Sequence, residues 1–233
     1  IVTIVLACLG LVLIHFVVPK PQTMPALNSA PYRTRLYEVF KQTELQRLNF
    51  GIFCQHAMLT ATFFVLPLRL NAAMEAQQIT ALWHFYLPML VISFLAAVPL
   101  ILVAEKRGQT KRVLLVSVGL MSVAQALLAQ HALPWVGFCS LMFVYFLAFN
   151  ALEAMLPSLV SKRTNPKNKG TAMGVYSSSQ FLGIFAGGSV AGLLYQHYGN
   201  SGVYITNALV AAVWLGIATS MKKKSTTKQP AIN

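Results

Sequence analysis

Long uncharged stretches alternate with short charged ones along this chain of 233 residues. The uncharged runs cover residues 1–18, 48–68, 76–104, 113–152 and 170–221. A membrane-spanning helix needs about 20 mainly apolar residues, so each of the two longest runs has room for two spans. Polar breaks at 130–134 and 197–202 divide them. The pattern predicts an all-α membrane protein with seven transmembrane helices, at about 1–18, 48–69, 79–104, 113–130, 135–160, 170–195 and 203–221.

The basic residues fall almost entirely on one side of this predicted topology. Of the 18 Lys and Arg residues, Arg69 alone lies on the other side. The rest gather at 20–47, 106–112, 162–169 and 222–228. Because short cytoplasmic loops of membrane proteins are rich in Lys and Arg, we expect the C-terminal tail, 222–233, to be cytoplasmic. The net charge of +13 then serves orientation and contact with anionic lipid, which argues against a nucleic-acid partner.

Composition and motifs point away from catalysis. The chain is 56% hydrophobic and 10% charged, too apolar for a soluble domain. Cys8, Cys54 and Cys139 lie within or at the edge of apolar runs, without the close spacing of a metal site or a disulfide framework. No nucleophile elbow, phosphate-binding loop or dinucleotide fingerprint occurs. We therefore expect no enzyme activity, no cofactor and no metal.

The first helix and the segment after it suggest a piece of a longer protein. Ile1 lies inside an apolar run, with neither a Met nor a basic region before it, so the expected first span lacks its beginning. Prolines interrupt residues 19–31, and 34–47 can form a short helix. Residues 19–47 therefore form a basic connecting loop, either as an interfacial amphipathic segment or as a solvated loop.

Glu153 is the one acidic residue inside a predicted span. A carboxylate in hydrocarbon is costly, so it normally pairs, takes up a proton or faces a polar cavity. Two hypotheses follow. Glu153 carries a coupling proton, or it is a structural acid that pairs with a cytoplasmic Lys or Arg in one conformation. Its short distance from the basic end of its helix favours the second.

Small residues concentrate in the span at 170–195. Glycines lie four positions apart at Gly170 and Gly174, and the same spacing recurs at Gly183/Gly187 and Gly188/Gly192. Such spacing lets two helix backbones approach closely in a membrane. Static close packing and a sliding contact that reseals in two states both fit this pattern.

Uncharged polar and histidine side chains also occur within the spans. For each of them a helix–helix hydrogen bond and a ligand contact remain open alternatives. They are Asn49, Gln55, His56, His84, Tyr145, Asn150, Tyr176, Gln180 and Asn207.

Three places resemble the C-terminal half of a major facilitator superfamily transporter. Residues 105–112 resemble the second-half copy of that family's Asp-Arg-x-Gly-Arg-Arg loop, through Glu105, Lys106, Arg107, Gly108, Lys111 and Arg112. The glycines of 170–195 resemble a degenerate copy of the drug-antiporter motif in helix eleven, through Gly174, Gly183, Gly187, Gly188 and Gly192. Residues 149–162 and 169–177 are similar to the YajR-like branch of proton-linked drug antiporters.

This resemblance implies a fold for the whole chain. Residues 1–18 would be helix six, the last of the N-terminal half, 19–47 the central cytoplasmic loop, and 48–221 the six-helix C-terminal bundle. The partners implied are the lipid bilayer, the missing N-terminal half, protons and a small-molecule substrate. The full-length protein would be a monomer in the bacterial inner (plasma) membrane.

The resemblance also implies a mechanism, namely alternating access with proton-coupled efflux of small lipophilic compounds, as in multidrug transporters. Helices seven, eight, ten and eleven would line the cavity, which makes Gln55, His56, His84, Asn150, Tyr176 and Gln180 candidate lining residues. We further hypothesise a latch in the outward-facing state, an ion pair from Glu153 to Lys106, Lys111 or Arg112.

Two other functions share part of this pattern. A seven-helix receptor also starts outside and ends in a basic tail, but the Asp-Arg-Tyr and Asn-Pro-x-x-Tyr signatures of such receptors are missing here. The other is a truncated half that transports nothing, since a transport path needs both halves around a midplane site.

Overall fold

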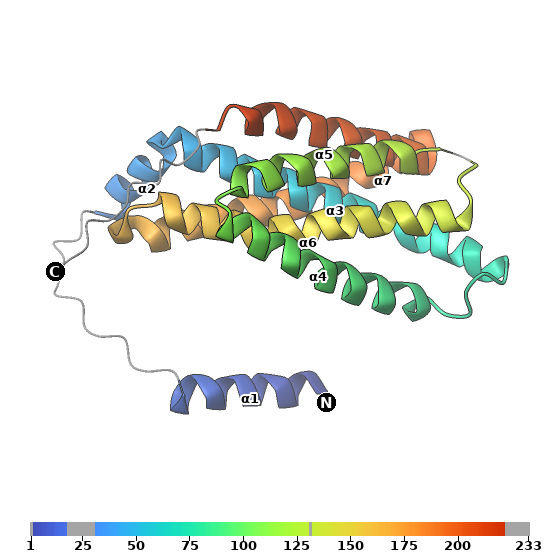
Figure 1. Ribbon diagram of the computed structural model, residues 1–233, viewed down its shortest axis with the longest axis horizontal. Helices are drawn as coiled ribbons and strands as arrows, with labels where there is room; N and C mark the ends of the chain where they lie inside the picture. The colour runs from blue at the N-terminus through green and yellow to red at the C-terminus, as the bar shows by residue number, and fades with distance from the viewer. Residues whose placement is uncertain (1, 18–30, 131, 222–233) are drawn as a thin grey trace. The chain divides into compact units, whose positions relative to one another are not determined.

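The computed structural model describes residues 2–17, 31–130 and 132–221 (Figure 1). All regular structure in these residues is helical, in the order α1 (Val2–Phe16), α2 (Tyr32–Lys41), α3 (Thr43–Glu75), α4 (Trp83–Lys106), α5 (Thr110–Leu128), α6 (Trp135–Arg163), the 3₁₀ turn η1 (Pro166–Asn168) and α7 (Lys169–Thr219). The chain divides into two units, residues 1–35 and 36–233. The first contains α1, an apolar helix, and α2 straddles the boundary.

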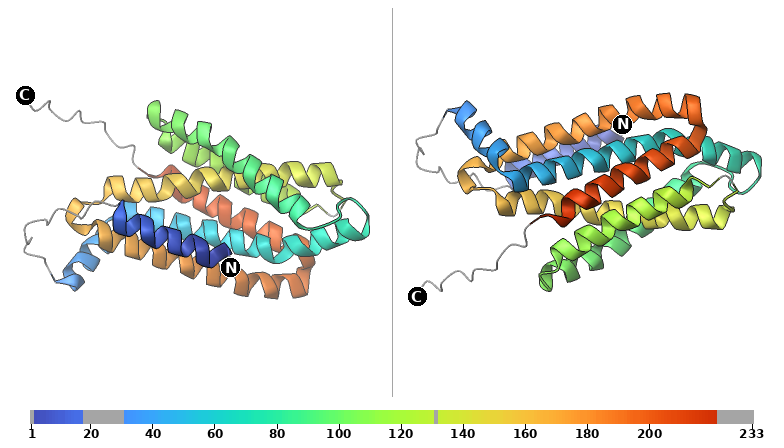
Figure 2. Two further views of the ribbon diagram at one scale, coloured as in Figure 1. Left: turned by 90° about the horizontal axis from the view of Figure 1, so that it is seen from below. Right: turned by 90° about the horizontal axis from the view of Figure 1, so that it is seen from above.

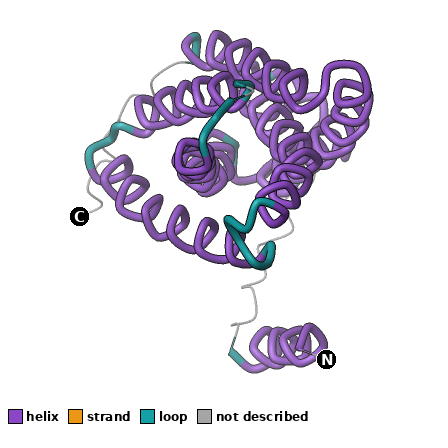
Figure 3. The backbone as a smooth tube through the Cα atoms, turned by 90° about the vertical axis from the view of Figure 1, so that its right-hand side faces the viewer, coloured by secondary structure: helices purple, strands orange, loops and turns teal. Residues whose placement is uncertain are grey.

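The second unit is a bundle of long helices joined by short loops (Figure 3). Within the described residues, five helices are long and apolar enough to cross a membrane: α3, α4, α5, α6 and the stretch Pro166–Thr219. That stretch has 54 residues and would extend about 80 Å as one straight helix. The hydrocarbon core is only about 30 Å thick, so it cannot be a single crossing.

Gly199 divides α7 into two antiparallel parts. Its backbone has φ 63° and ψ −161°, a conformation that side chains with a Cβ rarely adopt. The chain turns back there, and the part after Gly199 runs in the opposite direction to the part before it (Figures 1 and 2). The bundle therefore has six crossings, and α1 adds a seventh apolar helix. The predicted all-α membrane fold is confirmed.

The bundle has apolar side chains on its outside as well as in its core. Leu87, Phe94, Phe181, Phe185 and Val213 are all more than half exposed, as expected of a surface that contacts lipid. Inside, Leu66, Met121, Met142, Tyr145 and Trp214 are fully buried. A set of buried polar residues lies among them, at Thr62, Gln125 and Asn207.

The helix ends differ from the predicted spans mainly at α3. It begins at Thr43 and continues to Glu75, whereas the apolar pattern predicted about 48–69. At its end Ala72, Ala73, Met74 and Glu75 favour helix, so the connection between the spans predicted at 48–69 and 79–104 starts later. At its beginning, α3 includes residues 43–47, so the short helix predicted at 34–47 is divided between α2 and the first turns of α3. The predicted segments 19–30 and 222–233 lie outside the described residues.

Candidate functional site

Glu153 lies in a polar cluster that three helices build within the bundle. The Gln55 amide on α3 donates to Glu153 Oε2 on α6 at 3.1 Å, and to the Phe149 carbonyl at 3.3 Å. His56, the next residue on α3, places its Nε2 3.7 Å from the same carboxylate oxygen. The Gln180 amide on α7 is 2.8 Å from His56 Nε2. One acid, one imidazole and two amides thus share one site.

The burial of these side chains is uneven. Gln55 and His56 are buried, while the Glu153 side chain is 41% exposed. Tyr176 is buried within electrostatic range of Glu153, and its hydroxyl has no hydrogen-bond partner among the described residues. The carboxylate therefore reaches a face that the described bundle helices leave uncovered. The Tyr176 hydroxyl can form a hydrogen bond with a ligand or a water molecule there.

The cavity candidates from the sequence divide into two groups. Gln55, His56, Tyr176 and Gln180 gather around Glu153 as just described, and Asn150 lies one turn earlier on α6. The Asn150 amide donates to Ser93 Oγ on α4 at 3.1 Å.

His84 lies apart from that cluster. Its Nδ1 is 2.8 Å from the Thr80 hydroxyl, and it lines a separate pocket of about 260 Å³ together with Phe85, Trp135 and Phe143. The structure therefore does not bring His84 to the Glu153 site.

The residues of the 105–112 loop contact partners other than Glu153. Glu105 pairs with Lys162 at 2.6 Å and accepts a longer bond of 3.5 Å from Ser158. Lys111 donates to the carbonyls of Thr219 and Met221 at the end of α7. Gly108 forms the turn, with φ +61°.

No Lys or Arg in the described residues lies within 4.0 Å of the Glu153 carboxylate. The latch hypothesis concerns the outward-facing state, so its pairing with Lys106, Lys111 or Arg112 stays a prediction. Arg107 likewise has no described carboxylate partner.

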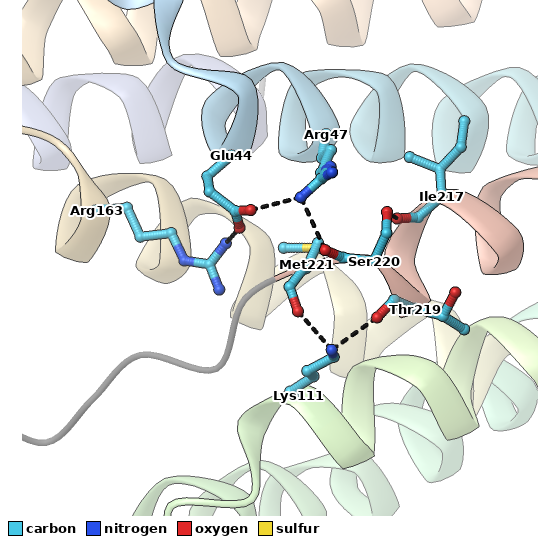
Figure 4. A network of polar contacts seen from close by, with 8 residues as sticks. All are labelled: Glu44, Arg47, Lys111, Arg163, Ile217, Thr219, Ser220 and Met221. Carbon is cyan, nitrogen blue, oxygen red and sulfur yellow. Dashed lines mark hydrogen bonds and ion pairs between the residues drawn. The ribbon is translucent and has the colours of Figure 1, made fainter.

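Glu44, which is not among the site residues predicted from the sequence, organises the charged end of the bundle (Figure 4). Its two carboxylate oxygens contact Arg163 at 2.5 Å and Arg47 at 2.6 Å. Arg47 also donates to the Ser220 carbonyl at 2.9 Å. The start of α3 is thereby connected to the ends of α6 and α7. The chain has only five acidic residues. The position of Glu44, close to the span predicted at 48–69, was the sequence signal that could have identified it.

The helix-eleven glycines also divide in two. A Cβ at Gly183 would lie 2.3 Å from the Phe53 carbonyl oxygen, and one at Gly187 would lie 2.1 Å from that of Ala57. The backbones of α3 and α7 therefore touch at these two positions. A Cβ at Gly188 would meet only Thr60 Cγ2 at 3.4 Å, and at Gly174 and Gly192 it would meet nothing within 4 Å. Two of the five motif glycines make the close contact.

Comparison with known proteins agrees with this architecture. Residues 48–232 match the Major Facilitator Superfamily domain. The chain is 39% identical over 222 residues to the inner membrane transport protein YajR of Escherichia coli strain K12, which covers 94% of this chain and 48% of that protein. It is 24% identical over 182 residues to an uncharacterized transporter of Buchnera aphidicola subsp. Baizongia pistaciae, which covers 78% of this chain and 46% of the relative.

A second Buchnera aphidicola relative, from subsp. Schizaphis graminum, is 25% identical over 228 residues, with 95% of this chain and 57% of the relative covered. The chain thus spans about half the length of the curated relatives it matches. Its helical bundle, its family match and its similarity to YajR agree: the chain belongs to the Major Facilitator Superfamily.

Proposed function

We propose that this chain is the C-terminal half of a bacterial inner-membrane transporter that exports small lipophilic compounds by alternating access, in exchange for protons. The family supports transport, and the similarity to an inner membrane protein of E. coli supports the location. The match to about half of each relative supports the assignment to one half. In such transporters the substrate binds near the bilayer midplane, between the two halves.

The environment of Glu153 is the observation that supports proton coupling. Its carboxylate contacts an amide and an imidazole, and within the described residues no Lys or Arg is close enough to fix its charge. Because the Glu153 carboxylate is partly exposed, a proton can reach it from the uncovered face. The neighbouring His56 imidazole can share that proton. This arrangement favours the proton-carrier hypothesis over that of a structural acid paired in this conformation.

The apolar part of the same site supports a lipophilic substrate. The Phe149 ring lies edge-on to His56 at 5.8 Å between centroids, and Tyr145 is tilted against Phe149 at 6.5 Å. Aromatic faces beside a few polar groups are typical of small-molecule sites. A compound bound against Phe149 would reach the Glu153 carboxylate, which couples its occupancy to the protonation of that group.

The latch remains part of the proposal, as an event of the outward-facing state. Lys111 now caps the end of α7 by donating to two carbonyls. Pairing with Glu153 would require Lys111 to leave those carbonyls, or Lys106 or Arg112 to approach instead. The same carboxylate would then alternate between a proton and a cation.

Glu153→Gln is expected to abolish transport driven by a pH gradient while retaining substrate exchange. The amide keeps the size of the side chain and its contact with Gln55 but cannot release a proton. We would reconstitute the full-length protein in liposomes and follow ethidium in two assays, accumulation driven by a pH gradient and counterflow without one. Glu75→Gln makes the same chemical change at an exposed helix end and should behave like wild type.

The two assays separate the hypotheses about Glu153. Loss of gradient-driven transport with counterflow intact supports a coupling proton. Loss of both, or of neither, contradicts it. The latch is tested by the inward/outward population, measured as a distance distribution between labels on the two halves, and an unchanged population in Glu153→Gln rules it out.

A further inference from the structure

A small polar cavity lies at the end of the bundle opposite Glu44 and Arg163. It has a volume of about 100 Å³ and is lined by Arg69 on α3, by Gln130 after α5, and by Asn200, Ser201 and Tyr204 at the start of the second part of α7. Leu128, Leu133 and Phe138 form the apolar part of its wall. A space of this size holds several water molecules or one small oxyanion.

Arg69 brings a charge to this cavity that the described residues do not neutralise. Its guanidinium donates to the Leu133 carbonyl at 3.0 Å and lies over the Phe138 ring at 5.7 Å. A guanidinium has five N–H donors, and none of the described carboxylates lies within 4.0 Å of it. A half-buried cation is stabilised by an anionic partner with matching geometry. The described residues provide no such partner for Arg69.

Tyr204 contributes an unused donor. Its side chain is only 4% exposed, and its hydroxyl has no hydrogen-bond partner among the described residues. Buried hydroxyls are rarely left without a partner. Asn200 Oδ1 is also buried and unpaired, and a half-turn of that amide places its NH₂ group where the oxygen now lies.

The backbone adds to the positive character of the site. The second part of α7 starts directly after the turn at Gly199, and Asn200 and Ser201 in its first turn line the cavity. The first N–H groups of a helix lack acceptors within that helix and carry a partial positive charge. Arg69, the Tyr204 hydroxyl and this helix start therefore converge on one small space.

We propose that this cavity binds a phosphate oxyanion, held by the Arg69 guanidinium and the Tyr204 hydroxyl against the start of the second part of α7. The anion is either free phosphate or the phosphate of a lipid headgroup, because the two present the same oxygens. The site is separate from the Glu153 cluster and does not depend on the proposed transport. It gives a reason for the one basic residue that the chain keeps on this side of the predicted topology.

The test is thermal unfolding of the full-length protein in lipid nanodiscs. In one arm the discs contain phosphatidylcholine, and inorganic phosphate is titrated at constant ionic strength. In the other arm phosphatidylglycerol replaces phosphatidylcholine in phosphate-free buffer. We expect the unfolding midpoint of the wild type to rise with phosphate, with phosphatidylglycerol, or with both, and the responding arm identifies the source of the anion.

Three variants assign the effect to this cavity. Arg69→Gln should raise the half-saturating concentration of the anion roughly tenfold or more, because a charge-assisted hydrogen bond is lost. Tyr204→Phe removes a single oxygen and should weaken it several-fold, which keeps the test valid if Arg69→Gln folds poorly. Tyr195→Phe makes the same change at a tyrosine outside the cavity and should respond like wild type. A wild type that responds in neither arm, or an Arg69→Gln response equal to that of wild type, overturns the proposal.

Discussion

Gly187→Ala is expected to destabilise the bundle by about 2–3 kcal/mol, since inserting a methylene into a well-packed contact costs about 1–3 kcal/mol and occasionally more. The new Cβ would lie 2.1 Å from the Ala57 carbonyl oxygen and 2.7 Å from its carbonyl carbon. These are backbone atoms of α3, so no side chain can rotate away and the helices must separate. Gly183→Ala should act similarly, through the Phe53 carbonyl at 2.3 Å.

Gly192→Ala and Gly174→Ala are the matched controls for this prediction. Both glycines lie on the same helix, and a Cβ there would meet nothing within 4 Å. Alanine is favoured over glycine in a helix interior by about 1 kcal/mol, so both variants should be as stable as wild type or more so. Thermal unfolding in detergent measures all four. Equal midpoints for Gly187→Ala and Gly192→Ala would show that α3 and α7 do not touch as described.

The location of this contact also bears on the two interpretations of the glycine motif. Gly183 and Gly187 face Phe53 and Ala57, and all four residues belong to the same bundle. In alternating access the halves move largely as rigid bodies against each other. Under the proposed mechanism a contact inside one half would be kept in both states, which favours static close packing at these two positions. Gly174 and Gly192 take no part in it.

The sequence predicted the number of bundle crossings because charged loops, together with two uncharged polar breaks at 130–134 and 197–202, interrupt the apolar runs. It also located the turn at 197–202, where Gly199 permits the backbone to reverse. It could not locate the ends of α3, because helix propensity continues beyond the hydrocarbon, through residues such as Ala72 and Ala73. The length of an apolar stretch reflects the thickness of the hydrocarbon core, and α3 is longer than that thickness.

The site was predictable in its members but not in its pairings. Family resemblance selected Gln55, His56 and Gln180. Yet the contacts of Gln55 and His56 with Glu153, and of Gln180 with His56, depend on the rotation of three helices. The same resemblance selected His84, which lies in a different pocket. Glu44 was missed because it was assigned to a loop, and its partner Arg163 is 119 positions away. Thr62 and Gln125 escaped notice as ordinary residues of apolar spans.

Asn207→Leu is expected to destabilise the bundle by about 1–3 kcal/mol, the cost of leaving a buried polar group without its partner. The Asn207 amide donates to Thr62 Oγ1 at 3.2 Å and to Gln125 Oε1 at 3.3 Å, and Gln125 donates to the same Thr62 oxygen at 2.9 Å. Without Asn207, Gln125 Oε1 loses its described donor inside an apolar core. Unfolding in detergent measures the loss.

Ser122→Ala is the control for that variant, because it removes one hydrogen bond, to the Ala208 carbonyl at 2.9 Å, between the same helices α5 and α7. Hydrogen bonds between membrane helices average about 0.6 kcal/mol, so this variant should lose about that much. A loss in Asn207→Leu no larger than in Ser122→Ala would contradict a shared network.

The double variant Asn207→Leu with Gln125→Leu distinguishes a network from separate bonds. With both amides replaced, Thr62 can donate to the carbonyl of Met58, four residues earlier on the same helix. That carbonyl now accepts from Asn207 at 3.4 Å and becomes available in the double variant. The remaining hydroxyl of this network, that of Thr62, is then paired, so the double variant should lose less stability than the two single losses together, by about 0.5–1.5 kcal/mol. Additive losses would mean that the three side chains stabilise the core independently.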